Sequence, residues 1–209
     1  MRRREKGGVL KGSIFNGWRL TAGIAAVLVL LSAVMVQMAP DPVHQARWVI
    51  QLTAWTSLLL FGLAFTASSL VRLSPSPATR WLRRQRRYLG VSFAVSHLIH
   101  LFGIFALMDL DYALFQQLTN RMTVVAGGGA YLLIMAMTLT SFDRMVRLMG
   151  PAAWGWLHLI GGWYIWASFA VSMGKRLGQG PLYWLGLGVV LSMLALRLLS
   201  RRAATAKVA

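Results

Sequence analysis

The chain has 209 residues, of which 57% are hydrophobic and only 13% are charged. Uninterrupted apolar runs of about 20 residues mark transmembrane helices, so this composition indicates one membrane domain without a separate soluble domain. Because there is no cysteine, thiolate metal sites, iron–sulfur clusters and catalytic disulfides are excluded. The net charge of +17 does not indicate a nucleic-acid-binding protein, because the basic residues lie in short segments between apolar runs.

Six apolar runs follow one another along the chain and predict an all-α membrane protein, a bundle of six transmembrane helices. Each run has about 20 residues, enough to cross a hydrocarbon core of about 30 Å. The first run is too long for a secretory signal peptide, so we expect it to be retained. We expect a basic cytoplasmic N-terminus at 1–17, a transmembrane domain at 18–200 and a cytoplasmic tail at 201–209. The predicted spans are Trp18–Met38, Trp48–Val71, Tyr88–Met108, Met122–Phe142, Ala153–Met173 and Leu182–Leu199.

The basic residues are divided unequally between the two ends of this bundle. Of the 22 Lys and Arg residues, 18 fall at the N-terminus, in the second and fourth connections and at the C-terminal end. Basic segments tend to stay in the cytoplasm, so both termini are predicted to be cytoplasmic. The cluster at 80–87 is interpreted as a topology determinant and lipid anchor, or as a docking surface for an acidic electron-donor protein.

Three histidines lie inside the predicted spans: His97 and His100 on the third, and His158 on the fifth. His97 and His100 are three residues apart and share a helix face. Ionisable groups inside a membrane are costly and suggest function, and imidazole is a common haem ligand. The third and fifth spans run in the same direction, so they could clamp a haem between them. The alternative is an ordinary interhelical hydrogen bond, while His44 is interpreted as a plain loop residue.

Two stretches of the sequence match a known family: Arg86-Arg87-Tyr88-Leu89-Gly90 followed by His100, and Thr140-Ser141 followed by Gly150, Trp154 and Leu157-His158. On these residues the sequence resembles the ferric reductase-like transmembrane domain family over roughly residues 48–200. It is similar to the small bacterial members that include the haem-binding membrane subunit of the methionine-sulfoxide reductase system. The resemblance implies six helices, with b-type haems held between the third and fifth by histidines about 13 residues apart on each.

The thirteen-residue spacing is incomplete in this sequence. Val171 stands thirteen residues after His158, and Arg87 stands thirteen before His100. If the two haem positions of the family are transferred directly to this sequence, each position therefore has only one histidine. This histidine is His158 on the cytoplasmic side and His100 on the outer side. At 1.5 Å per residue counted from Arg87, His97 lies about 15 Å and His100 about 20 Å into the membrane. Counted in the same way from Ala152, His158 lies about 9 Å deep. Depth therefore favours His97 as the partner of His158, whereas the resemblance favours His100. The preferred interpretation is a single haem bound by His158 and either His97 or His100.

The expected function is a b-type haem protein, with one haem or two, that passes electrons across the bacterial inner membrane. No GxGxxG motif is present, so the donor is expected to be a separate flavoprotein, such as a flavin reductase, or quinol. The outer acceptor would be a ferric chelate or a periplasmic oxidoreductase. Arg84, Arg86 and Arg87 are candidates for contacting haem propionates or the donor. The alternatives are a structural or assembly protein of the same fold and a small cation transporter.

Overall fold

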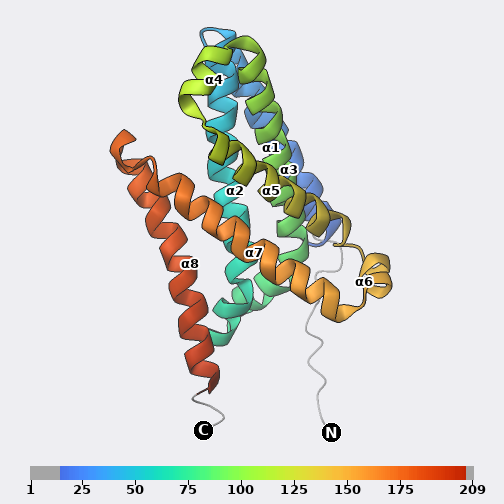
Figure 1. Ribbon diagram of the computed structural model, residues 1–209. Helices are drawn as coiled ribbons and strands as arrows, with labels where there is room; N and C mark the ends of the chain where they lie inside the picture. The colour runs from blue at the N-terminus through green and yellow to red at the C-terminus, as the bar shows by residue number, and fades with distance from the viewer. Residues whose placement is uncertain (1–14, 206–209) are drawn as a thin grey trace, which may run out of the picture.

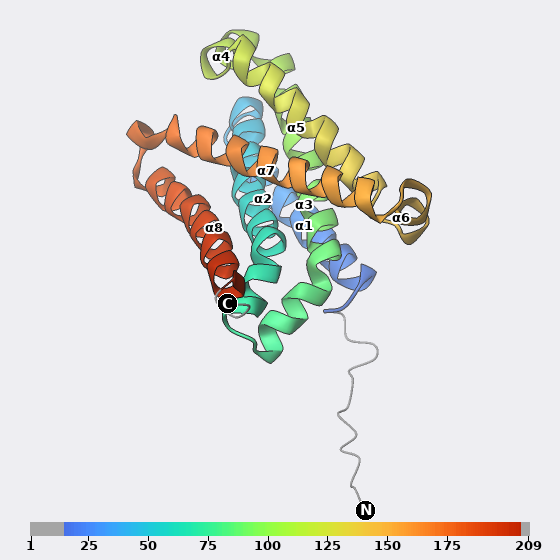
Figure 2. The ribbon, with the colours of Figure 1, turned by 60° about the horizontal axis from the view of Figure 1, so that its bottom comes forward.

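The computed structural model describes residues 15–205, which form eight α-helices and one short 3₁₀ helix without a β-strand (Figures 1 and 2). The all-α class predicted from the sequence is therefore confirmed for this part of the chain. In chain order the elements are α1 (Trp18–Met38), α2 (Pro42–Leu73), α3 (Pro77–Leu110), α4 (Tyr112–Leu118), α5 (Arg121–Leu139), α6 (Asp143–Met149), α7 (Pro151–Gly174), η1 (Leu177–Gln179) and α8 (Pro181–Thr205).

Side-chain caps and prolines explain where the two longest helices begin. At the start of α2, the Asp41 carboxylate accepts a hydrogen bond from the backbone N–H of His44, and Pro42 occupies the first turn. At the start of α3, Ser76 and Thr79 form a reciprocal capping box. These caps extend both helices well beyond the apolar runs from which they were predicted, so α2 has 32 residues and α3 has 34.

The antiparallel pair α2 and α3 forms the centre of the molecule. Small hydroxyl side chains line the contact between them, and Thr53, Ser57, Ser92 and Ser96 are all fully buried. Small residues let two helix backbones approach closely, which explains why this pair packs more extensively than any other. Helices α1 and α8 pack against the pair, and an aromatic cluster around Phe61 extends the core towards α7.

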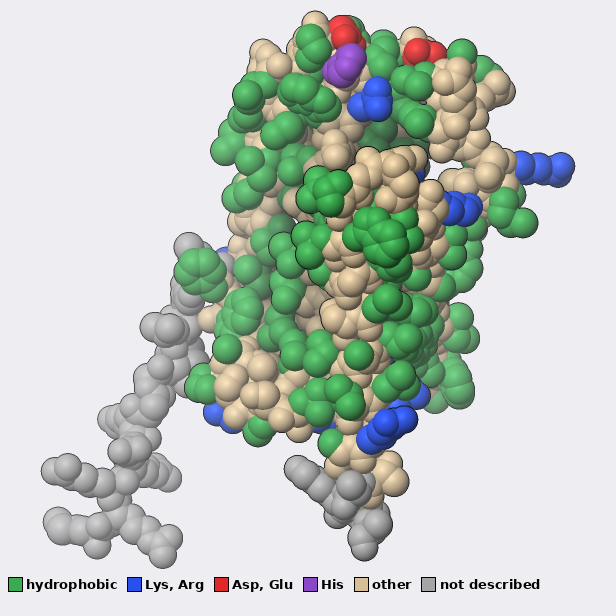
Figure 3. Space-filling model, turned by 90° about the vertical axis from the view of Figure 1, so that its left-hand side faces the viewer, with side chains coloured by type: hydrophobic (Ala, Val, Ile, Leu, Met, Phe, Trp, Pro, Cys, Tyr) green, Lys and Arg blue, Asp and Glu red, His purple; other side chains and the backbone are tan. Residues whose placement is uncertain are grey.

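The helices alternate in direction, so the two ends of the described chain lie at the same end of the molecule (Figure 1). The opposite end carries α4 and the turns that follow α1 and α3. On the face shown in Figure 3, the acidic side chains lie at the end opposite the termini, while Lys and Arg side chains lie towards both ends. The unequal distribution of basic residues is a property of the sequence, and the cytoplasmic assignment of the termini stays a prediction.

Five of the described helices are long and apolar enough to cross a membrane: α1, α2, α3, α5 and α8. Helix α7, which covers the predicted fifth span, has 24 residues but falls outside this set. Its tryptophans, glycines and His158 lower its hydropathy, and it runs obliquely across α2 in Figure 1. The predicted count of six spans therefore stays a prediction.

The predicted terminal segments fall largely outside the described residues. Residues 1–14 of the expected basic N-terminus and residues 206–209 of the expected tail are among those that the structure does not describe. Residues 201–205 continue α8 rather than forming a separate tail. Helices α4 and α6 are short additions at the two ends of α5 that the apolar runs did not indicate.

Candidate functional site

The two histidines of α3 face α2, on one side of the helix as their spacing predicted. The Nδ1 atom of His100 lies 3.0 Å from the Ile50 carbonyl oxygen and 3.1 Å from Thr53 Oγ1. His97 Nδ1 lies 3.2 Å from Ser57 Oγ. The two imidazole rings are stacked, with their centroids 5.2 Å apart. The structure therefore brings His97 and His100 together and fixes both rings against the same neighbouring helix.

A network of buried hydroxyl groups supports these two rings. Ser96 Oγ accepts a hydrogen bond from Ser57 Oγ at 3.0 Å and donates to the Thr53 carbonyl oxygen at 3.2 Å, and it lies 2.8 Å from Thr56 Oγ1. Sequence reasoning did not single out these hydroxyl residues. The available signal was the four-residue spacing of Thr53 and Ser57 within an apolar run, which places both on one helix face.

Helices α5 and α7 close the other side of His97. The ring of Tyr131 from α5 has its centroid 4.9 Å from that of His97, and the ring of Phe169 from α7 lies 6.3 Å away. The Tyr131 hydroxyl is buried and has no hydrogen-bond partner among the described residues. His97 is thus contacted by α2, α5 and α7 and is the more central of the two α3 histidines.

His158 occupies a different position in the fold. Its Nδ1 atom donates to the Trp154 carbonyl oxygen at 3.1 Å, one turn earlier in α7, and its ring stacks on the Trp154 indole at 4.2 Å. The Met137 carbonyl of α5 lies beside the same ring. Within residues 15–205, no hydrogen bond or ring contact connects His158 to either histidine of α3. A shared haem between these helices therefore stays a prediction.

The hydrogen bonds of all three rings favour the same tautomer. The Ser57 hydroxyl donates its hydrogen to Ser96, so its oxygen accepts a hydrogen bond from His97 Nδ1–H. A backbone carbonyl can only accept, so Nδ1 of His100 and of His158 also carries the proton. A neutral imidazole protonated on Nδ1 keeps its lone pair on Nε2, and metal-ligating histidines commonly use this orientation. The histidine set therefore fits a haem-ligand role chemically.

The glycines near the histidines have mainly a packing role. A Cβ atom on Gly103 would lie 2.9 Å from Ile50 Cγ1 of α2, and one on Gly161 would lie 2.7 Å from Met137 Sδ of α5. Both glycines therefore allow a close approach between helices. Small residues beside a haem ligand can also make room for a porphyrin, but close helix packing is enough to explain both glycines.

Of the predicted arginines, Arg87 already has a partner within the protein. It forms an ion pair with Asp143 of α6, and this hydrogen bond lowers the pKa of the Asp143 carboxyl below its usual value. A contact between Arg87 and a cofactor stays a prediction. Arg86, one residue earlier, instead turns into a pocket with arginines of α2 and α8.

These observations define an all-helical protein in which several helices are long and apolar enough to cross a membrane. Two of its histidines, His97 and His100, lie on one of these helices, α3, and His158 lies on α7. The chain is similar to curated proteins named protein-methionine-sulfoxide reductase heme-binding subunit MsrQ. It is 28% identical to the one from Pasteurella multocida over 159 residues, which cover 71% of this chain and 74% of that protein. It is 30% identical to the one from Deinococcus radiodurans over 143 residues, covering 65% and 64%.

A shorter match has the highest identity of these three. The chain is 34% identical to the MsrQ protein of Ralstonia nicotianae over 107 residues, which cover 50% of this chain and 47% of that protein. No protein-family model and no solved structure matches the chain. The likeness to MsrQ proteins is therefore supported by several relatives, while membership of the wider ferric reductase-like family stays a prediction.

Proposed function

We propose that this protein is a multi-pass, haem-binding membrane protein that carries electrons across the bacterial inner membrane to an acceptor on the outer side. The observation that carries the proposal is the shared hydrogen bonding of His97, His100 and His158, each with Nδ1 engaged in a hydrogen bond that favours a lone pair on Nε2. The names of the similar MsrQ proteins support the same cofactor, haem. The acceptor is then expected to be a periplasmic methionine-sulfoxide reductase.

The proposed haem would be of b type and would be held by His158 together with His97 or His100. The stacked rings of His97 and His100 lie side by side on one helix face, so they are not suited to opposite faces of a single porphyrin. A haem held by these histidines would supply reversible one-electron transfer. The α2 hydroxyls orient the α3 rings, and the surrounding apolar side chains exclude water.

The electron donor would be a separate flavoprotein or quinol at the cytoplasmic end, which would carry the basic segment at 80–87. A structural or assembly role is the second candidate. It is favoured by one observation, that Val171 and Arg87 occupy the positions where the related family has its second histidine on each helix.

The test is the visible spectrum of the purified full-length protein before and after reduction with dithionite. A Soret band with a sharp reduced α-band is expected, and a colourless protein from haem-replete cells would favour the assembly role. Among single variants, we expect His158→Ala to remove the haem, and only one of His97→Ala and His100→Ala to do so. His44→Ala is the matched control, because His44 lies at the N-terminus of α2 and pairs with Asp41. Two haems per chain, measured by pyridine haemochrome, would instead favour separate sites for His100 and His158.

A further inference from the structure

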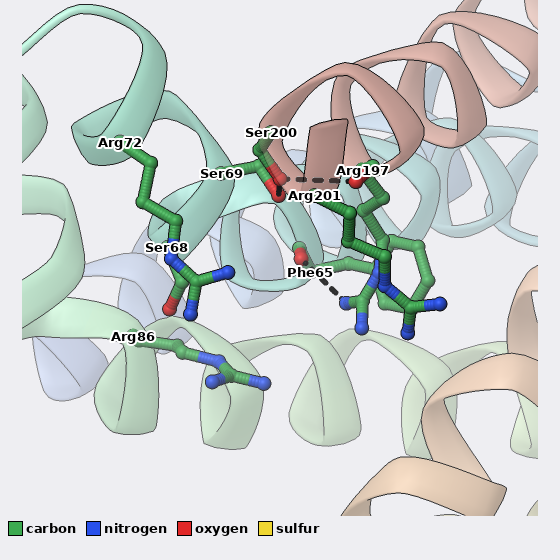
Figure 4. Close-up of a pocket in the computed structure, with 8 residues that line it drawn as sticks. All are labelled: Phe65, Ser68, Ser69, Arg72, Arg86, Arg197, Ser200 and Arg201. Carbon is green, nitrogen blue, oxygen red and sulfur yellow. Dashed lines mark hydrogen bonds between the residues drawn. The ribbon is translucent and has the colours of Figure 1, made fainter. Parts of the chain in front are cut away.

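A polar pocket lies between α2, α3 and α8, at the end of the molecule that carries both termini (Figure 4). Its volume is about 170 Å³. Figure 4 shows that arginines from all three helices turn towards this common space, and serines lie at its edge. The lining residues are Phe65, Ser68, Ser69, Arg72, Arg86, Arg197, Ser200 and Arg201.

The four guanidinium groups of this pocket face no protein carboxylate in the described part of the chain. Asp41, Asp109 and Asp111 lie at the opposite end of the helices, and Asp143 pairs with Arg87 outside the pocket. Four positive charges from three helices repel one another when nothing neutralises them. An anion in the pocket would reduce this repulsion and join the three helix ends.

Contacts within the protein also hold the lining of the pocket in a defined arrangement. Arg197 donates a hydrogen bond to the Phe65 carbonyl oxygen at 3.1 Å, and its guanidinium lies 4.2 Å from the centre of the Phe65 ring and 5.0 Å from that of Trp163. Ser200 donates to Ser69 at 3.0 Å. These contacts fix α8 against α2 and hold one guanidinium in place, so the pocket is organised before a ligand arrives.

The depth of the pocket matches the level of lipid headgroups. Arg201 stands twenty residues after Pro181, the first residue of α8. At 1.5 Å per residue this separation is about 30 Å, the thickness of the hydrocarbon core. Leu198 and Leu199, beside the pocket arginines, are about half exposed and face outwards from the bundle. A ligand at this site can therefore have acyl chains in the membrane and a charged group between the helices.

We propose that this pocket binds the phosphate group of an anionic phospholipid. Arginine binds phosphate oxygens through paired N–H donors, and serine hydroxyls can donate to the same oxygens. The ligand chemistry is a phosphate ester, which a soluble phosphate compound could also provide. The position at headgroup depth favours the lipid. The pocket contains none of the histidines proposed to hold haem, and of its arginines only Arg86 is also a candidate for contacting haem propionates.

The experiment is a titration of the delipidated full-length protein in detergent with phosphatidylglycerol, phosphatidylcholine or inorganic phosphate, followed by native mass spectrometry and thermal unfolding. Phosphatidylglycerol is expected to bind as one tight equivalent and to raise the melting temperature, while phosphatidylcholine and inorganic phosphate do neither. The double variant Arg72→Gln/Arg86→Gln is expected to bind about 30-fold more weakly, because each arginine contributes about fivefold. The matched control is Arg80→Gln/Arg83→Gln, which removes two exposed charges of α3 outside the pocket.

Three results would overturn the proposal. Equal binding of phosphatidylglycerol by both double variants would show only a general attraction to a basic surface. Equal tightness for inorganic phosphate would assign the pocket to a soluble ligand. Loss of haem from the Arg72→Gln/Arg86→Gln variant with unchanged lipid binding would assign its arginines to haem propionates. If the wild-type protein lacks haem but binds phosphatidylglycerol as expected, the haem function fails and the lipid site stands.

Discussion

Ser96 is the residue on which the polar contacts between α2 and α3 converge. Its hydroxyl is fully buried and connects Thr56, Ser57 and the Thr53 carbonyl, while Ser57 in turn holds His97. Ser92, one turn earlier, is equally buried but bonds only to the Tyr88 carbonyl of its own helix. The two serines therefore form a matched pair that differs in connections between helices.

We expect Ser96→Ala to destabilise the protein by about 1–2 kcal/mol, because it leaves buried hydroxyl groups of α2 without their partner. Ser92→Ala should have a much smaller effect, since a bond to the same helix contributes little to tertiary stability. Thermal unfolding in detergent measures both. Equal losses from the two variants would show that the network between the helices does not contribute beyond packing.

The Arg87–Asp143 pair predicts a specific dependence on pH. Its hydrogen bond lowers the pKa of the Asp143 carboxyl from the usual 3.8. A lowered pKa in the folded state means that the stabilisation is present above pH 3.8 and is lost as the pH falls through the lowered value. The effect is small, because the Asp143 side chain is 70% exposed.

We therefore expect Asp143→Asn to lower the melting temperature slightly at neutral pH and to make no difference below the lowered pKa. Melting curves of the wild type and the variant at a series of pH values measure this convergence. Asp111→Asn, at the opposite end of α3, serves as a control for general charge effects. A difference that persists at low pH would mean that Asp143 acts through something other than its charge.

At the scale of elements, close packing of α3 on α2 depends on Gly103. An added Cβ would lie 2.9 Å from Ile50 Cγ1 and 3.6 Å from the Ala46 carbonyl oxygen, so the two helices would have to separate. Gly90, on the same helix, has nothing within 4 Å of the corresponding position. We expect Gly103→Ala to destabilise by about 1–3 kcal/mol. Gly90→Ala should stabilise by about 0.5–1 kcal/mol, because alanine loses less backbone freedom in a helix.

Unfolding in detergent measures both variants, and the opposite sign of the two effects is the critical result. If Gly103→Ala also stabilised the protein, the α2–α3 contact would have to be looser than its buried serines indicate.

The sequence predicted the positions of the long helices better than the contacts between helices. Apolar runs mark a helix whatever it packs against, so α1 was predicted to the residue, at Trp18–Met38. The starts of α2 and α3 depend on the polar caps Asp41 and Ser76, which lie outside any apolar run. Short helices such as α6, at Asp143–Met149, bury little apolar surface and leave no periodic pattern to detect.

The candidate site was predicted in part, for a related reason. A three-residue spacing places His97 and His100 on one face, but it cannot show that this face meets Thr53 and Ser57, some forty residues earlier. In the basic segment, charge alone did not distinguish Arg87, which meets Asp143, from Arg86, which enters the pocket. That difference depends on one helical step of about 100° and on where α6 and α8 lie.

At the scale of the whole molecule, the charge distribution makes the orientation in the membrane testable. The chain has no cysteine, so a single introduced thiol reports one position. Ala204 and Gln179 are both exposed and lie at opposite ends of α8. We expect a membrane-impermeant maleimide to label Gln179→Cys in intact spheroplasts and to label Ala204→Cys only after lysis. Labelling of Ala204→Cys before lysis would place the C-terminal end outside.

The lengths of α2 and α3 have a consequence for how a soluble protein would meet this one. At 1.5 Å per residue, 32 and 34 residues extend about 48 and 51 Å, well beyond a hydrocarbon core of about 30 Å. Ordinary tilts of about 20° shorten the span only slightly, so part of the hairpin would project beyond the hydrocarbon core into the headgroup layer. The projecting end includes the first turns of α3 with their arginines. A partner could therefore dock on this end of the α2–α3 hairpin without disturbing the bilayer. The length by which the hairpin extends beyond the hydrocarbon core would set the distance between the partner and the buried histidines.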